Sequence, residues 1–261
     1  MTLYFACIAS QKSLTTWLFR NILEHPELYF PPNTNLISRK ELNLFLSARG
    51  PNYPKVVLGD NLTKFKCGDM SPQYLTRPEC MEKIYNHNPN MKIIVMFKHP
   101  IARALSQFLM ERSFNIPSFE VLKTMSFYDA YINDYPQAPQ ISMAERNRYA
   151  THLAAWMERF PREQIHVIVS EDITTHPREV LQGVFKFLDI QEIYNEKFVN
   201  AIVRPLNIGS PPDRRQFITD EEYNDLLART NDEVTRLEEL IGRDLSFYKK
   251  NHFDNKYVPP S

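Results

Sequence analysis

Glycine is scarce in this chain of 261 residues. The six glycines are about a third of the number that an average usage of about 7% would supply. They stand far apart in the sequence, so no two of them can build a glycine-rich phosphate loop. The dinucleotide fingerprint and the Walker loop both need clustered glycines, because the backbone must approach a pyrophosphate closely. The sequence therefore excludes these two modes of nucleotide binding.

An excess of charge of either sign is also missing. Lysine and arginine together number 31, as do aspartate and glutamate, so the formal net charge is zero. No overall field attracts nucleic acid or an acidic membrane surface. We therefore expect no nucleic-acid partner, and any anion site must be local.

Cysteine and long apolar runs are the remaining absences. The three cysteines form no Cys-x-x-Cys pair, and an odd number fits a reducing cytosol better than a disulfide scaffold. The apolar residues 3–9 follow no lysine or arginine and are too few for a convincing signal peptide. No apolar run approaches the roughly 20 residues of a membrane helix. These observations predict a cytoplasmic protein without a membrane span.

Short apolar segments alternate with amphipathic ones along the chain. Residues 3–8, 92–97 and 165–169 are rich in β-branched or aromatic side chains and lie between polar turns, which predicts strands. Weaker candidates are residues 55–58 and 65–67. Strands that alternate with helices predict the α/β class, with a central parallel sheet flanked by helices.

Apolar residues at helical spacing predict three helices in the second half of the chain. The first covers residues 149–160 and stops at Pro161, and the second begins at Pro177. The third covers residues 220–241, with Gly242 as its end.

The remaining composition defines the domain organisation. Residues 133–144 contain two prolines, which predicts a loop. The length and a hydrophobic share of 43% suffice for a core without a disulfide or metal. We therefore expect one domain over residues 1–250 and a polar tail over residues 251–261.

A segment rich in hydroxyl groups follows the first predicted strand. It reads Ser10-Gln11-Lys12-Ser13-Leu14-Thr15-Thr16-Trp17 and leads into a helix. A strand that turns directly into a helix aims free backbone N–H groups and the positive end of the helix dipole at one point, which suits a phosphate. Lys12 adds a full charge, and Ser13, Thr15 and Thr16 add hydroxyl donors. A plain helix N-cap is the alternative, since serine and threonine are favoured there, but this crowding of donors favours an anion site.

A second group of polar residues follows the strand predicted at residues 92–97. Lys98-His99-Pro100 ends that strand, and the next helix contains Arg103 and Ser106 on a face apart from its apolar stripe. A solvated helix face is the alternative. Parallel strands end at the same edge of a sheet, where ligands bind in such folds. Two groups of cations and hydroxyls at one edge predict a ligand with two phosphate-like groups.

These segments resemble the nucleotide-binding motifs of sulfotransferases that use 3′-phosphoadenosine 5′-phosphosulfate (PAPS). Residues 12–17 are similar to the 5′-phosphosulfate loop, and residues 98–106 to the 3′-phosphate motif, commonly Arg-Asp-Pro-x-x-Arg-x-x-Ser. Lys40-Glu41-Leu42-Asn43-Leu44-Phe45 and Gly68-Asp69-Met70-Ser71-Pro72-Gln73-Tyr74-Leu75 resemble segments of the carbohydrate and bacterial branch, which includes heparan sulfate sulfotransferases. The shared order spans roughly residues 3–190. It implies a P-loop-like sulfotransferase fold.

The resemblance implies transfer of the sulfuryl group of PAPS to a hydroxyl or amine of a carbohydrate or small-metabolite acceptor, with PAP as product and no metal. Lys12 would stabilise the bridging oxygen and the 5′-phosphate, while Ser13, Thr15 and Thr16 would hold the phosphosulfate. Trp17 would stack against adenine, although core packing explains a tryptophan on a helix equally well.

The resemblance also implies roles for residues further along the chain. Lys98 and Ser106 would bind the 3′-phosphate, with Arg103 close by. Glu41 would be the general base that takes the acceptor's proton. The alternative for Glu41 is a surface carboxylate at the start of a short helix.

Four positions depart from the pattern of the family. Lys98 stands where arginine is usual and lacks the bidentate fork of arginine, and His99 replaces an aspartate. Leu14 stands where glycine is frequent, which narrows the backbone options of the loop. Met70 stands where some relatives have a lysine. The methionine supplies no cation to help neutralise the sulfuryl group.

Two other functions fit parts of this pattern. A nucleotide or metabolite kinase of P-loop-like architecture is disfavoured by the missing Walker loop and by the lack of a Mg²⁺ carboxylate after a strand. A catalytically inactive PAPS- or PAP-binding protein is suggested by three of the departures, at Lys98, Leu14 and Met70. Pairs such as Arg146 with Arg148, or Arg214 with Arg215, could still engage an anionic polysaccharide despite the zero net charge.

Overall fold

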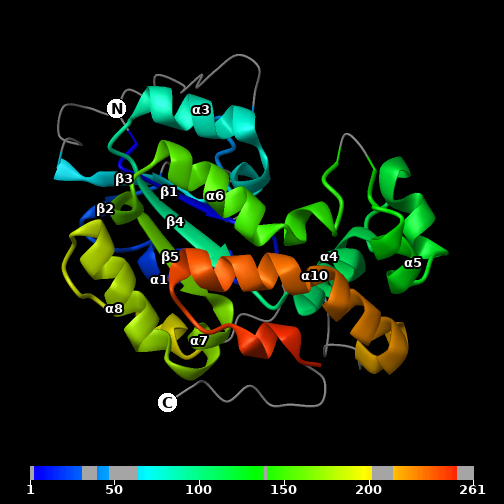
Figure 1. Ribbon diagram of the computed structural model, residues 1–261. Helices are drawn as coiled ribbons and strands as arrows, with labels where there is room; N and C mark the ends of the chain where they lie inside the picture. Colours follow the sequence, from blue (N-terminus) through cyan, green and yellow to red (C-terminus); the bar gives the residue numbers. More distant parts are fainter. Residues whose placement is uncertain (1–2, 31–39, 47–63, 138–139, 202–213, 252–261) are drawn as a thin grey trace. The chain divides into compact units, whose positions relative to one another are not determined.

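The computed structural model describes residues 3–30, 40–46, 64–137, 140–201 and 214–251 (Figure 1). The chain is organised in two compact units. The first comprises Met1–Ala9, Ser13–Phe97 and Ala155–Val203, and the second comprises Ser10–Lys12, Lys98–Ala154 and Arg204–Ser261. The single domain over residues 1–250 stays a prediction, and residues 252–261 of the expected tail lie outside the described residues.

The first unit is built on a five-stranded sheet with the order β2-β3-β1-β4-β5, and each pair of neighbours is parallel. The predicted α/β class with a central parallel sheet is therefore confirmed. All five residues of the central strand β1 are buried, as expected for a parallel strand covered on both faces. The strands are β1 (Phe5–Ala9), β2 (Leu28–Tyr29), β3 (Lys66–Asp69), β4 (Lys92–Phe97) and β5 (Ile165–Val169).

The strand predictions differ in accuracy. The predictions over residues 92–97 and 165–169 are confirmed, since β4 and β5 have these bounds. The first strand ends one residue later than predicted, at Ala9, where it pairs with Met96 of β4. The candidate at residues 65–67 corresponds to β3, and the candidate at residues 55–58 lies outside the described residues.

Helices cover both faces of this sheet, with α8 and α3 on opposite sides in Figure 1. Side chains of α1, α7 and α8 form one hydrophobic core with inward residues of β1, β4 and β5, such as Cys7, Met96 and Ile168. The helices of this unit are α1 (Thr15–Ile22), α3 (Pro78–His87), α7 (Ser170–Thr175), α8 (Pro177–Leu188) and α9 (Glu196–Val199), with 3-10 turns at Pro72–Thr76 and Arg162–Gln164.

The second unit is helical. A core of apolar side chains from α4, α5 and α10, including Leu105, Phe127 and Leu226, holds it together. Its helices are α4 (Pro100–Glu111), α5 (Phe127–Ile132) and α10 (Asp220–Ile241), with 3-10 turns at Pro117–Lys123, Glu145–Asn147, Arg214–Phe217 and Ser246–Lys249; α6 (Tyr149–Arg159) contributes its residues up to Ala154.

The predicted ends of α10 are confirmed. The side chain of Thr219 accepts the backbone N–H of Glu222, whose carboxylate accepts the N–H of Thr219 in return, so a capping box starts the helix. Gly242 ends it in the left-handed region, with φ of 66°, a conformation that favours glycine.

The three cysteines and the apolar character of the helices complete the description of the fold. Cys7, Cys67 and Cys80 are buried free thiols, and burial raises the pKa of Cys7 and of Cys67 to about 12. Among the described residues, no helix combines the length and apolar character that crossing a membrane requires.

Candidate functional site

The loop after β1 has an unusual backbone. Lys12 and Leu14 both lie in the left-handed region, with φ of 78° and 60°, a conformation that costs an L-residue roughly 1–2 kcal/mol. Leu14 is the N-cap of α1, and no side chain caps the helix. The plain serine or threonine N-cap considered above is therefore wrong. The N–H groups of Trp17 and Leu18 donate to the carbonyl of Leu14 at 2.9 and 3.4 Å. The N–H groups that come earlier at a helix start generally lack intrahelical acceptors, which makes such a terminus suitable for an anion.

Ser13, Thr15 and Thr16 surround that helix terminus. Ser13 is fully buried, and its carbonyl accepts a hydrogen bond of 2.9 Å from the hydroxyl of Ser170, the first residue of α7. The Oγ1 atoms of Thr15 and Thr16 accept hydrogen bonds from Nζ of Lys40, at 3.2 and 3.3 Å. Lys40 and Ser170 are thus part of the site, although neither follows from the phosphate-loop motif itself.

Lys40 also connects this loop to the predicted general base. Its Nζ lies 2.8 Å from Oε1 of Glu41, whose side chain is 22% exposed. The structure therefore brings Thr15, Thr16 and Glu41 into one cluster around a buried ammonium group. Glu41 is not an isolated surface carboxylate, which leaves the catalytic interpretation intact.

The segment that contains Glu41 is held by buried residues of the Gly-Asp-Met-Ser-Pro-Gln-Tyr motif. Asp69 accepts the backbone N–H of Leu42 and the hydroxyls of Ser71 and Tyr74, at 3.2, 2.5 and 2.5 Å. The Ser71 hydroxyl accepts from the N–H of Asn43 in turn. Burial raises the pKa of Asp69 to about 6, while these hydrogen bonds oppose the shift. This motif therefore holds the segment that follows the predicted base.

Trp17 lies in the hydrophobic core. Its side chain is 1% exposed, and Nε1 donates to the carbonyl of Val199 at 3.2 Å. Core packing therefore accounts for the residue, as the sequence allowed. The ring also borders a cavity of about 180 Å³ that Leu14, Thr174 and Thr175 help to line. Stacking of Trp17 against adenine stays a prediction.

The other predicted residues belong to the second unit. Nζ of Lys12 lies 3.5 Å from Sδ of Met110 on α4. The carbonyl of Lys98 accepts the hydroxyl of Tyr149 at 2.8 Å, and Ser106 is half-buried on α4. Direct contact of Lys98 and Ser106 with a 3′-phosphate stays a prediction.

Arg103 is completely buried, so the expectation of a helix face apart from the buried one is wrong for this residue. Its Nε donates to Oδ1 of Asn147 at 2.6 Å, and Nη2 donates to the carbonyl of Met143 at 2.8 Å. Nη1 donates to Oε1 of Gln107 at 2.6 Å and lies 3.5 Å from the carbonyl of Gln11. Because protein acceptors occupy each nitrogen, we expect Arg103 to position the Gln11 end of the loop rather than to bind phosphate.

His99, which replaces the aspartate of the family, is also buried. Its ring packs against the rings of Tyr223 and Tyr248, and Nε2 lies 3.1 Å from the carbonyl of Lys250. His99 therefore connects the start of α4 to the turn at Ser246–Lys249 and the residue after it, a structural role that the sequence left unassigned.

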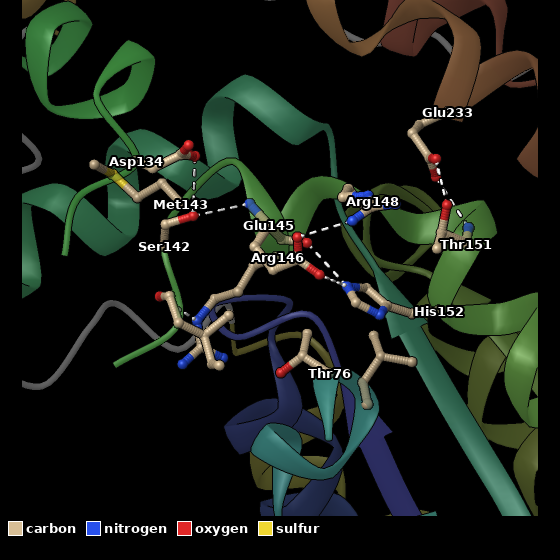
Figure 2. Close-up of polar contacts among 12 residues, drawn as sticks. Thr76, Asp134, Ser142, Met143, Glu145, Arg146, Arg148, Thr151, His152 and Glu233 are labelled. Atoms are coloured by element: carbon tan, nitrogen blue, oxygen red, sulfur yellow. Dashed lines mark hydrogen bonds and ion pairs between the residues drawn. The ribbon is translucent and has the colours of Figure 1, made fainter. Parts of the chain in front are cut away.

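The arginines of the pair 146 and 148 have partners nearby. Figure 2 shows Glu145 between Arg148 and His152. The carboxylate of Glu145 lies 3.1 Å from Nη1 of Arg148 and 3.4 Å from Nε2 of His152. Arg146 is buried, and its Nε donates to the carbonyl of Ile141. The side chain of Arg214 in the other pair lies outside the described part of the chain. Arg148 is thus paired with a carboxylate and Arg146 is buried, while binding of an anionic polysaccharide at this pair stays a prediction.

A metal site is not apparent in the described part of the chain. No group of three or more histidine, cysteine, aspartate or glutamate side chains there could hold a metal ion. The chemistry available in the described cluster is that of ammonium, hydroxyl, carboxylate and backbone N–H groups.

Comparisons with known proteins agree on one family. The profile of the Sulfotransferase family matches residues 2–195. The chain is 26% identical over 204 residues to the bifunctional heparan sulfate N-deacetylase/N-sulfotransferase 4 of Mus musculus, which covers 73% of this chain. It is 29% identical over 128 residues to the heparan sulfate glucosamine 3-O-sulfotransferase 5 of Homo sapiens, which covers 47%. The matches span 23% and 35% of these relatives, so the chain corresponds to part of each.

Solved structures agree on the fold. A sulfotransferase from Alicyclobacillus acidocaldarius superposes with a TM-score of 0.66 and 23% identity, covering 96% of this chain and all of the other. A mouse sulfotransferase complexed with PAP superposes with a TM-score of 0.55 and 15% identity, covering 88% and 83% of the two chains. The expected P-loop-like fold of these proteins is confirmed.

Proposed function

Since this chain belongs to the Sulfotransferase family, we propose that it transfers the sulfuryl group of PAPS to a hydroxyl or amine of a carbohydrate acceptor and releases PAP. The relatives named for heparan sulfate support a carbohydrate acceptor. The chain spans about a quarter to a third of those relatives, so the identity of the sugar is left open by the comparison.

One cluster carries this proposal. Thr15, Thr16, Lys40 and Glu41 gather hydroxyls, an ammonium and a carboxylate at the uncapped N-terminus of α1. Hydroxyl and N–H donors fit the anionic oxygens of a phosphosulfate, and a neighbouring carboxylate fits the proton of an acceptor. The residues present therefore fit the donor without a metal.

The protein's own residues would act by position and charge. When bound, PAPS supplies an electrophilic sulfuryl group and an anionic leaving group. Lys12 neutralises the charge that develops on the bridging oxygen, and Ser13, Thr15 and Thr16 hold the phosphosulfate oxygens. Glu41 takes the proton from the attacking hydroxyl or amine. Catalysis of this kind depends on positioning and charge, as phosphoryl transfer does.

Transfer of radiolabelled sulfate from PAPS to a panel of acceptors tests the proposal. The panel contains N-deacetylated and sulfated oligosaccharides, neutral sugars and small hydroxylated metabolites. We expect label in a carbohydrate without added magnesium, and tight binding of PAP. Tight binding of PAP with no labelled acceptor would support a binding protein instead, whereas magnesium-dependent consumption of ATP would support a kinase.

Glu41→Gln tests the assignment of the base. The substitution keeps the shape of the side chain but cannot accept the proton, so we expect turnover to fall by roughly 10²–10⁴-fold. The affinity for PAP, measured by calorimetry, should stay within about two-fold of the parent protein. Glu145→Gln, on the second unit, is the matched control. Turnover at the parent rate in Glu41→Gln would reject this role.

A further inference from the structure

Lys40 has an ammonium group that is buried beside the phosphosulfate loop. The side chain is 6% exposed, and Nζ contacts Thr15, Thr16 and Glu41 at 3.2, 3.3 and 2.8 Å. Burying a charge is costly unless it is paired and hydrogen-bonded. A lysine therefore stays at such a position only where the structure or the chemistry uses its charge.

The backbone around Lys40 is held without the help of its ammonium group. The carbonyl of Lys40 accepts the N–H of Met70 at 3.0 Å, and the carboxylate of Asp69 accepts the N–H of Leu42 at 3.2 Å. The N–H of Asn43 donates to Ser71. Because these bonds hold residues 40–43, the backbone here does not depend on the ammonium group, whose contacts are with Thr15, Thr16 and Glu41.

The two threonine hydroxyls can donate to an anion. A hydroxyl whose oxygen accepts from an ammonium keeps its own proton for donation. Neither hydroxyl donates a hydrogen bond to another described residue, and Thr16 is half-buried at the first turn of α1. The ammonium and the two O–H groups thus form a set of donors beside the helix N-terminus.

We propose that Lys40 is a second catalytic cation, which contacts the oxygens of the sulfuryl group while Glu41 takes the acceptor's proton. The inference rests on the proposed function. In the step, the bond between sulfur and the bridging oxygen breaks and its electron pair stays on that oxygen. An electron pair of the acceptor oxygen or nitrogen forms the new bond to sulfur, and the released proton goes to the carboxylate of Glu41. Lys40 balances the negative charge of the sulfuryl oxygens throughout.

A catalytic role and a structural role of Lys40 have different effects on the binding of PAPS and of PAP. PAP lacks the sulfuryl group, so a cation that contacts this group affects the binding of PAPS but not of PAP. A lysine that only holds Thr15 and Thr16 in place would affect both, because the threonines also serve the 5′-phosphate. The ratio of the two dissociation constants therefore distinguishes a catalytic from a structural role.

Lys40→Met is the first variant, and Lys186→Met, which removes an exposed lysine of α8, is the matched control. Calorimetry without acceptor measures the affinities for PAPS and PAP, and radiolabelled transfer measures turnover. We expect Lys40→Met to lower turnover by roughly 10²–10³-fold. Its affinity for PAPS should fall at least about five-fold, with the affinity for PAP within about two-fold.

Two further variants keep the test decisive. If thermal unfolding shows that Lys40→Met is not folded, Lys40→Gln takes its place. Glutamine also removes the charge but keeps a side chain that can form hydrogen bonds. Lys40→Arg retains the charge and should recover at least about a tenth of the parent turnover. Equal losses of PAPS and PAP affinity, or turnover within three-fold of the parent in Lys40→Met and Lys40→Gln, would overturn the inference. A parent protein that neither binds PAP nor transfers sulfate would instead refute the proposed function.

Discussion

Lys40 of the first unit and Arg103 of the second are both buried cations next to predicted phosphate motifs, and their partners differ. Lys40 contacts two hydroxyls and a carboxylate that is 22% exposed. Arg103 donates to side-chain amides and backbone carbonyls inside the second unit. A ligand can replace hydroxyl and carboxylate partners near the surface, whereas replacing the partners of Arg103 would leave buried acceptors without donors.

The comparison separates cations that serve a ligand from cations that serve the fold. Burial alone does not distinguish them, because both side chains are almost inaccessible. The identity of the partners does. Replacing a cation of the first kind, one that serves a ligand, should lower turnover and leave the free energy of unfolding nearly unchanged. Replacing a cation of the second kind, one that serves the fold, should lower the free energy of unfolding more than the turnover.

Lys12→Ala should give the largest effect, because Lys12 belongs to the first kind. Its Nζ lies 3.5 Å from Sδ of Met110, and the family resemblance places its charge at the leaving group. Removing the charge at the leaving group should lower turnover by roughly 10³-fold. Sulfate transfer measures the loss, and urea unfolding should show a change below about 1 kcal/mol. If the loss of stability accounted for the loss of turnover, Lys12 would be a cation that serves the fold.

Arg103→Met should have the opposite profile. The substitution leaves the buried acceptors of Asn147, Gln107 and Met143 without their donor. Each such acceptor costs roughly 1–3 kcal/mol, so we expect the free energy of unfolding to fall by about 3 kcal/mol. Urea unfolding followed by far-ultraviolet circular dichroism measures it. An unchanged midpoint with weaker binding of PAP would make Arg103 a phosphate ligand after all.

The main strands of the fold follow from the sequence. The strand Lys92–Phe97 is apolar after its first residue, and Ile165–Val169 is apolar except for His166. Such short runs are characteristic of strands buried on both faces. β2 has two residues and is therefore too short to give a hydrophobic pattern. The division into two units depends on contacts between distant segments, which no local pattern contains.

The site was predictable only where residues are neighbours in the sequence. The order of hydroxyls in residues 12–17 predicts an anion site, but Lys40 reaches Thr15 across 25 positions and Ser170 reaches Ser13 across 157. Arg103 shows the reverse case. Its spacing from Ser106 suggested a polar helix face, but Asn147 and Met143 from another segment enclose it.

Glu111 lies on α4, the helix that contains Arg103, and its titration should make the stability of the protein depend on pH. Nε2 of Gln107, whose Oε1 serves Arg103, donates to Oε1 of Glu111 at 2.9 Å. Burial raises the pKa of Glu111 from 4.5 to about 7, against the opposing charges of Arg146, Arg103 and Lys12. Since the folded state binds the proton more tightly, this group stabilises the protein below pH 4.5, and the contribution is lost as the pH rises through 7.

Glu111→Gln should remove that dependence. We expect the parent protein to lose about 2 kcal/mol of stability from Glu111 between pH 5 and pH 8 relative to the variant. The difference between the two proteins is the quantity to measure, because burial lowers the pKa of His166 to about 4. That histidine stabilises above pH 6.5 and has the opposite slope in both proteins. Parallel curves of unfolding free energy against pH would show that Glu111 does not titrate in this range.

Arg148→Ala should have the smallest effect and defines a third kind of cation. Arg148 pairs with Glu145 at 3.1 Å, and the two side chains are 53% and 39% exposed. Exposed ion pairs contribute little, because water and salt screen them and two mobile side chains lose entropy. We expect a change of at most about 0.5 kcal/mol in urea unfolding, smaller still in 0.5 M salt. A loss above about 1.5 kcal/mol would mean that exchangeable, exposed partners can stabilise this fold as strongly as buried ones, and the distinction between Lys40 and Arg103 would then lose its physical basis.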